Sequence, residues 1–338
     1  MAEPVGPGGP ADPVGQVHDG QPHGGQPPAG QVRGSWRRSA LSVTFLVLAV
    51  AAFAFALAGQ WSQVVDRLAE QEPVVLAGSL GLALVGVFVS FLLWRGTLGT
   101  LGSTLPVRPA ARLFFVTQLG KYLPGAVWPV LAQMRMGREH GIPRQRMGLA
   151  FLLTLGVTTL VGVLLGAAAL PALLRAEGQV VLLGLLALPL LLVLLVPRVL
   201  NVLLDRGLRV IRRPGLEAPL SGRDVSRGAG VAVLFWLLYS GHVWLLAVGL
   251  GADPWETFPV ALGGFAIAFS LGPLLVVLPA GAGVREAVLV VMLSGVLSTP
   301  DATAVALTSR ALLILTDGLL ALGAVLVRND HARVIDGT

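Results

Sequence analysis

Long apolar blocks separated by short polar stretches dominate the sequence. The blocks cover approximately residues 40–58, 73–93, 147–170, 179–196, 228–250 and 302–327. At 1.5 Å per residue, each block reaches about 30 Å, the thickness of the hydrocarbon core of a bilayer. The apolar residues fill these blocks rather than recurring at the period of one buried face, which is typical of transmembrane helices. We therefore predict an all-α polytopic membrane protein with about six transmembrane helices.

The first block has an alternative interpretation as a secretory signal peptide. Ala56-Leu57-Ala58 is typical of a cleavage site at the end of such a segment. The long preceding tail and the apolar blocks that follow favour a retained helix.

Two further apolar segments are interrupted by proline and glycine. Residues 109–136 are divided by Pro124-Gly125, and residues 259–298 are divided by a Pro-Ala-Gly-Ala-Gly turn at 279–283. The arms of the first segment, of about 14 and 11 residues, are too short to span a bilayer. Proline frees a backbone carbonyl, and inside a membrane such groups are tolerated only within protein or beside water. We predict two re-entrant helical hairpins, the first entering from the cytoplasm and the second from outside.

The order of these segments repeats along the chain. Two helices, a hairpin and a helix make up repeat one at about 40–170, and the same order makes up repeat two at about 178–327. Opposed repeats with interrupted helices in matching positions are typical of transporters. We expect two inverted repeats within a membrane domain at 35–328. A disordered cytoplasmic tail rich in Gly, Pro, Gln and His precedes it at 1–34, and a short cytoplasmic tail follows at 329–338.

Composition and charge agree with this interpretation. The 338 residues are 54% hydrophobic and 12% charged, whereas soluble domains carry about 25% charged residues. The net charge of +6 comes from arginines in alternate loops, which predicts cytoplasmic N- and C-termini in the cell membrane. These arginines indicate orientation and contact with anionic lipid, so we expect no nucleic-acid partner. The absence of cysteine excludes disulfides and thiolate chemistry.

The first interrupted segment carries the only lysine of the chain, Lys121. With Thr117 and Gln118 it would line one face of the first arm, at spacings of three and four residues. The second arm begins after Pro124-Gly125, so its free N–H groups would point to the same place. A lysine beside a helix N-terminus favours an anion such as a lipid phosphate. The alternative is that Lys121 extends to the membrane interface.

The second interrupted segment places two ionisable residues after its glycine-rich turn. Arg285 and Glu286 open the short arm, and Gly281 and Gly283 permit the tight turn before it. Ionisable residues in an apolar context suggest a functional site. The alternative is that Glu286 pairs with an arginine elsewhere and holds the repeats together.

The last predicted helix carries three polar residues at seven-residue spacing. Thr303, Arg310 and Asp317 would share one face, about 10 Å apart. Either hydrogen-bonded packing or ligand contact would explain such a stripe. His242 is a candidate proton relay, although a lone histidine in a helix is usually structural. No metal-ligand cluster, phosphate loop or nucleophile motif occurs in the sequence, so we expect no metal, no cofactor and no enzymatic activity.

The interrupted segments resemble the transmembrane region of lysylphosphatidylglycerol synthases, a broad flippase-like family. The matching stretches are QLGKYLPG at 118–125 with Trp128-Pro129, LPAGAGVRE at 278–286, and Arg310. The resemblance implies two inverted repeats with re-entrant helices, proposed to move phospholipid or lipid-linked headgroups between leaflets. The headgroup-binding residues that it implies are Gln118, Lys121, Tyr122, Pro124, Gly125, Gly281, Gly283, Arg285, Glu286 and Arg310.

The sequence also departs from this family in two ways. Some members adjoin a cytosolic aminoacyl transferase domain that uses charged tRNA; this chain ends about a dozen residues after its last predicted helix, so we expect that domain to be absent. The family often has an arginine with acidic residues in the third helix, where this chain has Thr154, Thr158 and Thr159. This difference argues against a charge network that spans both repeats.

Two functions remain open at this point. The first is translocation of phospholipid or lipid-linked anionic headgroups, with membrane lipids as the partners. The second is a non-transporting scaffold for a glycosyltransferase or lipid-modifying enzyme, which would be a membrane-associated partner. An intramembrane transferase acting on a polyprenyl-linked lipid is disfavoured, because few acidic residues lie at membrane depth.

Overall fold

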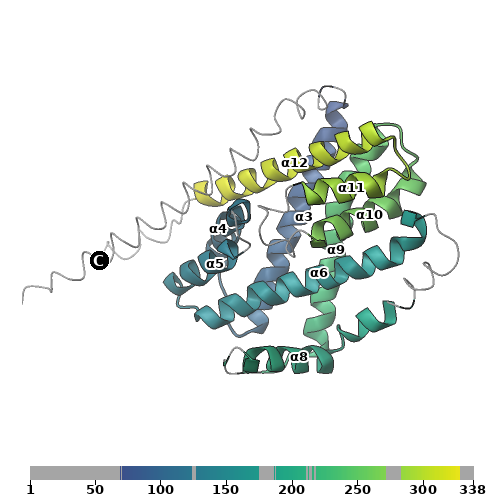
Figure 1. Ribbon diagram of the computed structural model, residues 1–338. Helices are drawn as coiled ribbons and strands as arrows, with labels where there is room; N and C mark the ends of the chain where they lie inside the picture. Colours follow the sequence, from purple (N-terminus) through teal and green to yellow (C-terminus); the bar gives the residue numbers. More distant parts are fainter. Residues whose placement is uncertain are drawn as a thin grey trace, which may run out of the picture. The chain divides into compact units, whose positions relative to one another are not determined.

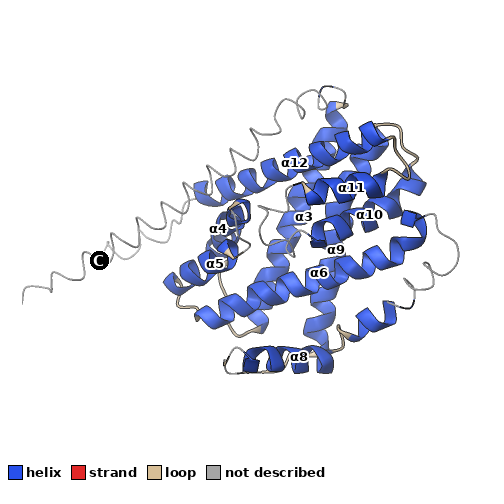
Figure 2. Cartoon of the chain, in the orientation of Figure 1, coloured by secondary structure: helices blue, strands red, loops and turns tan. Residues whose placement is uncertain are grey.

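The computed structural model describes residues 71–123, 127–174, 188–210, 218–271 and 283–327, with a few isolated residues beside them. Every secondary-structure element in these ranges is a helix (Figure 2). Four of the described helices are long and apolar enough to cross a membrane: α3 (Pro73–Thr100), α6 (Arg144–Leu174), α9 (Gly222–Gly249) and α12 (Thr299–Leu326). They confirm the helices predicted at 73–93, 147–170, 228–250 and 302–327.

Several predicted features lie outside the described residues. These are the helix at 40–58, both tails (1–34 and 329–338) and the first part of the helix at 179–196, residues 179–185. The total of six membrane-crossing helices therefore stays a prediction.

Polar residues set where the long helices begin. Pro73 opens α3, where its missing N–H costs no helical hydrogen bond. At α9, the Ser221 hydroxyl accepts from the Asp224 N–H at 3.2 Å, and the Asp224 carboxylate accepts from the Ser221 N–H at 3.1 Å. This reciprocal pair is a capping box. The Ser298 hydroxyl caps α12 by accepting from the Asp301 N–H at 3.3 Å.

Both interrupted segments form two helical arms that pack against each other. The first consists of α4 (Val107–Gln118), a 3-10 turn η1 (Leu119–Tyr122) and α5 (Trp128–Glu139). The second consists of α10 (Pro254–Leu271) and α11 (Val284–Leu293). The predicted division into short arms is confirmed for the first segment, since η1 ends where Leu123 turns to extended backbone. How deeply either hairpin enters a membrane stays a prediction.

Small residues let the long helices approach closely. Along α3 and α9, Gly249 faces Val75, Gly78 faces Leu245 and Gly86 faces Tyr239, so the two helices run antiparallel. Such close contacts between small residues are the usual means by which membrane helices pack. Helix α6 crosses this pair (Figure 1) and packs on α10.

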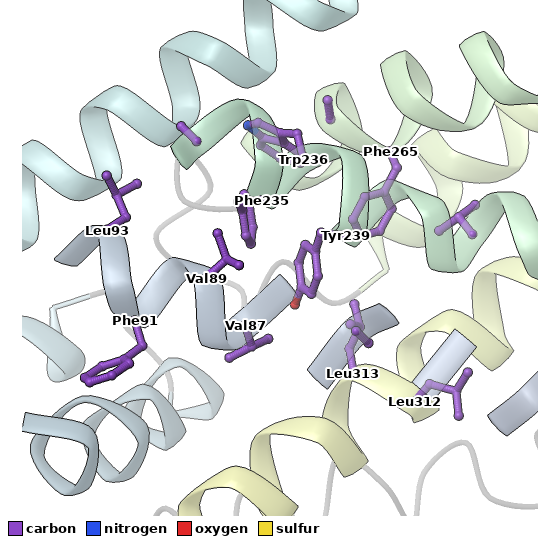
Figure 3. Close-up of a cluster of buried hydrophobic side chains, with 14 of the residues drawn as sticks. Val87, Val89, Phe91, Leu93, Phe235, Trp236, Tyr239, Phe265, Leu312 and Leu313 are labelled. Carbon is purple, nitrogen blue, oxygen red and sulfur yellow. The ribbon is translucent and has the colours of Figure 1, made fainter. Parts of the chain in front are cut away.

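Aromatic side chains fill the interior between these helices. Tyr239 of α9 extends between Val87 of α3 and Leu313 of α12 (Figure 3). Its ring lies 4.7 Å from Phe235 and 5.5 Å from Phe265 of α10, measured between centroids. This cluster fixes the positions of the helices that carry the buried charges.

The basic stretch at 198–227 contains a helix that the sequence analysis did not predict. Helix α8 (Pro197–Val210) has one apolar and one arginine-bearing face. Its Asn201 side chain pairs with the backbone of Leu220, donating to the carbonyl at 3.0 Å and accepting from the N–H at 2.9 Å. Asn201 thereby attaches α8 to the segment that leads into α9.

Candidate functional site

The first group of buried charges joins the first hairpin to the last long helix. The Tyr122 hydroxyl donates to Asp317 Oδ2 at 2.6 Å, and Lys121 Nζ lies 2.7 Å from the same oxygen. The Asp317 side chain is 2% exposed and that of Lys121 is 27% exposed. Lys121 is therefore paired with a buried carboxylate. The sequence analysis offered two interpretations, a lysine that binds an anion and a lysine that extends to the membrane interface, and neither includes this pairing.

The second group joins the second hairpin to the same helix. Arg285 Nη2 and Arg310 Nη1 each lie 3.3 Å from Glu286 Oε1. The other oxygen, Glu286 Oε2, accepts from the Gly283 N–H at 2.7 Å. Gly283 has a φ of +84°, a conformation that favours glycine, and so the turn aims this N–H at the carboxylate. Glu286 thus pairs with an arginine elsewhere, Arg310, which lies in the same predicted repeat.

The second group contains more positive than negative charge. Arg285 and Arg310 share the single carboxylate of Glu286, and both arginines are buried. The Arg285 guanidinium also lies 5.9 Å from the centre of the Phe269 ring, within the range of a cation–π contact. Lys121 and Asp317 balance each other. We refer to Lys121, Arg285, Glu286, Arg310 and Asp317 as the α12 charge cluster. These five side chains together carry one net positive charge.

The predicted polar stripe of α12 is correct for two of its three members. Arg310 and Asp317 are buried and lie two helical turns apart. Thr303 is exposed, and its hydroxyl donates to the Thr299 carbonyl at 2.8 Å. A seven-residue spacing drifts by about 20° per repeat around a straight helix. Thr303 also lies in the first turns of α12, close to the N-terminus of the helix.

His242 lies beside this helix and has a structural environment. Its ring is fully buried, with Nε2 2.8 Å from the Ser309 hydroxyl and Nδ1 against the Tyr239 carbonyl. The Ser79 hydroxyl donates to the His242 carbonyl at 3.2 Å. These contacts tie α9 to α12 and α3, which agrees with the structural interpretation of this histidine.

The remaining predicted site residues differ in burial, and three of them lie outside the described residues. Gln118 is half-buried at the end of α4. Thr117 does not line a ligand face: it is fully buried, and its hydroxyl donates to the carbonyls of Leu113 and Phe114 at 2.8 and 3.0 Å. Pro124, Gly125 and Gly281 lie outside the described residues.

The structure corrects one expectation taken from the family resemblance. We expected no charge network across both repeats, because the third helix carries threonines instead of charges. In fact Lys121 and Tyr122, in the segment predicted as repeat one, contact Asp317, in the segment predicted as repeat two. On α6, the Thr158 hydroxyl donates to the Thr154 carbonyl of its own helix. Sequence reasoning placed Asp317 on the polar stripe of the last helix but did not identify it as the partner of Lys121 and Tyr122.

Four membrane-length helices, two interrupted segments and a buried charge cluster define a multi-pass helical membrane protein. The family model of the lysylphosphatidylglycerol synthase TM region matches residues 41–321, and the chain belongs to this family. The match confirms the resemblance inferred from the two interrupted segments. Comparison with curated proteins gave no match.

Proposed function

We propose that this protein is a lipid translocase that moves phospholipids or lipid-linked anionic headgroups between leaflets, and that it is not itself an enzyme. The observation that carries the proposal is the net positive charge of the α12 charge cluster. Buried charge inside a membrane domain is costly and is usually retained for function. An unbalanced guanidinium favours an anionic ligand, and phosphate accepts charge-assisted hydrogen bonds from arginine in a geometry that suits it.

Arg285 is the residue that we propose to meet the headgroup. It opens α11, and Arg310 remains paired with Glu286 if Arg285 turns to another anion. A phosphate would replace Glu286 as the partner of Arg285 without leaving a carboxylate unpaired. Lys121, which is partly exposed, provides a second cation on the first hairpin, where Asp317 balances it.

The packing of the helices supports two inverted repeats. The helices α3, α4, α5 and α6 can be matched in order with α9, α10, α11 and α12. When each helix is replaced by its match, every contact among these eight helices corresponds to a contact that is also observed. The α4–α12 contact corresponds to α10–α6, the α5–α6 contact to α11–α12, and the α3–α12 contact to α9–α6. The matched helices α3 and α9 run antiparallel, as repeats of opposite orientation require. In this arrangement the hairpins approach α12 from opposite sides of the membrane.

The distribution of arginines supports the predicted orientation. The end of α3, the start of α6 and the start of α9 lie together, because Arg146 donates to the Gly102 carbonyl and Thr100 contacts Asp224. Arginines cluster at this end of the helices, whereas Asp253 lies in the turn between α9 and α10 and Glu256 in the first turn of α10. The positive-inside rule places the basic end in the cytoplasm. We therefore propose a cell-membrane protein with both termini cytoplasmic.

A transport assay tests this function. The purified protein is reconstituted into liposomes that contain fluorescent phosphatidylglycerol, and a membrane-impermeant quencher reports how much probe reaches the outer leaflet. We expect quenching beyond the outer-leaflet half with the wild-type protein. Arg285→Gln should lower the transport rate at least tenfold while the protein stays folded, because one cation then remains for each carboxylate, Arg310 for Glu286 and Lys121 for Asp317.

Two controls make the outcome interpretable. Arg223→Gln removes an exposed arginine from the start of α9, outside the α12 charge cluster, and should leave transport unchanged. Thermal unfolding confirms that each variant is folded. Absence of movement with phosphatidylglycerol and with lipid-linked anionic probes would overturn the proposal. It would favour the scaffold function, which predicts an enzyme that co-purifies with this protein.

A further inference from the structure

A groove of about 410 Å³ opens between α3, α6, α8 and α9. Its volume lies within the range of sites that bind small ligands. None of the residues of the α12 charge cluster lines it. The groove is therefore separate from the α12 charge cluster, and the proposed function leaves it unexplained.

The groove is polar at one end and apolar at the other. Helices α3 and α9 run antiparallel along it, so Thr100 lies against Asp224, and Leu93 faces Gly228 one turn further on. Leu153 of α6 and Val231 of α9 line the apolar part. A polar end that continues into an apolar slot matches a phospholipid, which has a polar headgroup and a hydrocarbon chain.

The polar end offers a cation for the headgroup. Arg227 lines the groove and is exposed. The carboxylate of neighbouring Asp224 accepts hydrogen bonds from the Ser221 N–H in the capping box and from the Thr100 hydroxyl at 3.5 Å. Arg227 is exposed at the opening, where its charge acts on the neighbouring Asp224 carboxylate and would also complement a phosphate.

Helix α8 places this opening at the level of the lipid headgroups. Its arginines Arg198, Arg206 and Arg209 lie on one face, and apolar residues occupy the other. Leu203 and Val210 are 47% and 82% exposed, so the apolar face is only partly covered by protein. A short amphipathic helix with basic residues lies in the plane of the membrane interface and is attracted to anionic lipid.

The same helix borders the groove directly. Leu200 of α8 lines it together with Leu220, the residue that Asn201 holds through two hydrogen bonds. A helix lying in the interface therefore forms the rim of the opening.

We propose that this groove binds one anionic phospholipid from the surrounding leaflet. Its acyl chain lies between Leu93, Leu153 and Val231, and its phosphate is held by Arg227. This inference goes beyond the proposed function and stands whether or not the chain transports lipid, because it concerns binding at a different place.

Photocrosslinking tests the position of the acyl chain. The full-length protein is purified with phosphatidylglycerol that carries a diazirine in one acyl chain, irradiated, and mapped by peptide mass spectrometry. We expect labelling concentrated in the α6 and α9 segments that contain Leu153 and Val231. Gly96→Leu should reduce this labelling at least fivefold, because a Cβ at Gly96 meets no protein atom within 4 Å and the leucine would fill the groove instead.

Gly81→Leu is the matched control for this substitution. It makes the same change in the same helix, also where a Cβ meets nothing within 4 Å, but it does not line the groove. Its labelling should equal that of the wild type. Equal labelling in wild type and Gly96→Leu, or labelling spread evenly over the lipid-facing helices, would overturn the site.

The headgroup is tested by repeating the labelling with phosphatidylcholine, whose headgroup is zwitterionic. Arg227→Gln should reduce the labelling by phosphatidylglycerol several-fold and leave that by phosphatidylcholine unchanged. An equal effect on both lipids, or none, would overturn the assignment of the phosphate to Arg227. The transport assay is read separately, so failure of translocation and failure of this site are distinguishable.

Discussion

Each of the two carboxylates in the α12 charge cluster is shared by two side-chain donors. Asp317 serves Lys121 and Tyr122, whereas Glu286 serves two arginines. Removing one partner of a buried ion pair is costly because the remaining charge stays desolvated. The two carboxylates therefore differ in how much uncompensated charge they would leave behind.

Asp317→Asn should lower stability, because it removes the counter-ion of Lys121 while keeping an oxygen for the Tyr122 hydroxyl. We expect a loss on the order of 1–3 kcal/mol, reduced by the partial exposure of Lys121. Thermal unfolding in detergent should show a melting temperature lower by about 2–4 °C for each kcal/mol. The double variant with Lys121→Met should recover most of the loss. Purely additive losses would contradict the coupling of the two residues.

Glu286→Gln should destabilise the protein more than Asp317→Asn does, because it leaves two buried guanidinium groups close together. The expected loss is about 3–5 kcal/mol. Glu256→Gln is the matched control, since Glu256 is exposed in the first turn of α10. Adding Arg285→Gln to Glu286→Gln should restore part of the stability. A melting temperature for Glu286→Gln equal to that of the control would refute the role of the carboxylate.

The sequence predicted which of these residues are buried better than it predicted their partners. Arg310 and Asp317 follow from charges inside an apolar helix. The Tyr122–Asp317 contact joins residues 195 positions apart, and it depends on how the first hairpin packs on α12. Local patterns carry no information on such a contact. Lys121, which was expected to be available for an anionic ligand, is found paired with Asp317.

At the scale of elements, the breaks in the chain were easier to predict than the helix at the surface. The helical turn η1 of the first hairpin ends just before Pro124, where the sequence indicated a break. Helix α8 was not predicted, because its arginines are typical of a basic loop, although Val199, Leu200, Leu203 and Leu204 follow a helical period. A basic amphipathic helix and a basic loop have similar composition, and only the spacing of apolar residues distinguishes them.

Close packing of α6 on its neighbours predicts an asymmetry between two glycines of that helix. A Cβ at Gly162 would lie 2.5 Å from Trp236 Cζ2 and 2.7 Å from Ser270 Oγ, whereas a Cβ at Gly156 meets nothing within 4 Å. Gly162→Ala must displace the Trp236 ring, whose N–H donates to the Thr158 carbonyl at 2.9 Å. We expect a loss of about 1–3 kcal/mol.

Thermal unfolding of both glycine variants measures this difference. Gly156→Ala should match or slightly exceed the wild type, because alanine favours helix over glycine. If both variants unfold at the wild-type temperature, α6 does not pack against Trp236 as described.

At the scale of the whole molecule, the order of segments along the chain predicts a repeat. The exchange of contacts between the two halves could not be predicted, because it depends on interhelical packing. The absence of cysteine from the chain offers a direct test of orientation. Single cysteines at Ser226, on the basic end, and Glu256, on the acidic end, introduce one reactive group each.

A membrane-impermeant maleimide applied to intact cells should label Glu256→Cys and leave Ser226→Cys unlabelled until the cells are opened. The expected contrast follows from the positive-inside rule. Labelling of Ser226→Cys in intact cells would contradict the proposed orientation. It would show that the basic end of the helices faces outward and would place the first hairpin on the outer side.

The central claim is that the unbalanced charge of Arg285 selects an anionic headgroup. The measurement that tests it most directly is the ratio of transport rates for phosphatidylglycerol and phosphatidylcholine in liposomes, compared between wild type, Arg285→Lys and Arg285→Gln. We predict a ratio well above one in wild type, a partly retained ratio with lysine and a ratio near one with glutamine. A ratio that is the same in all three proteins would contradict the claim and would remove Arg285 from the headgroup site.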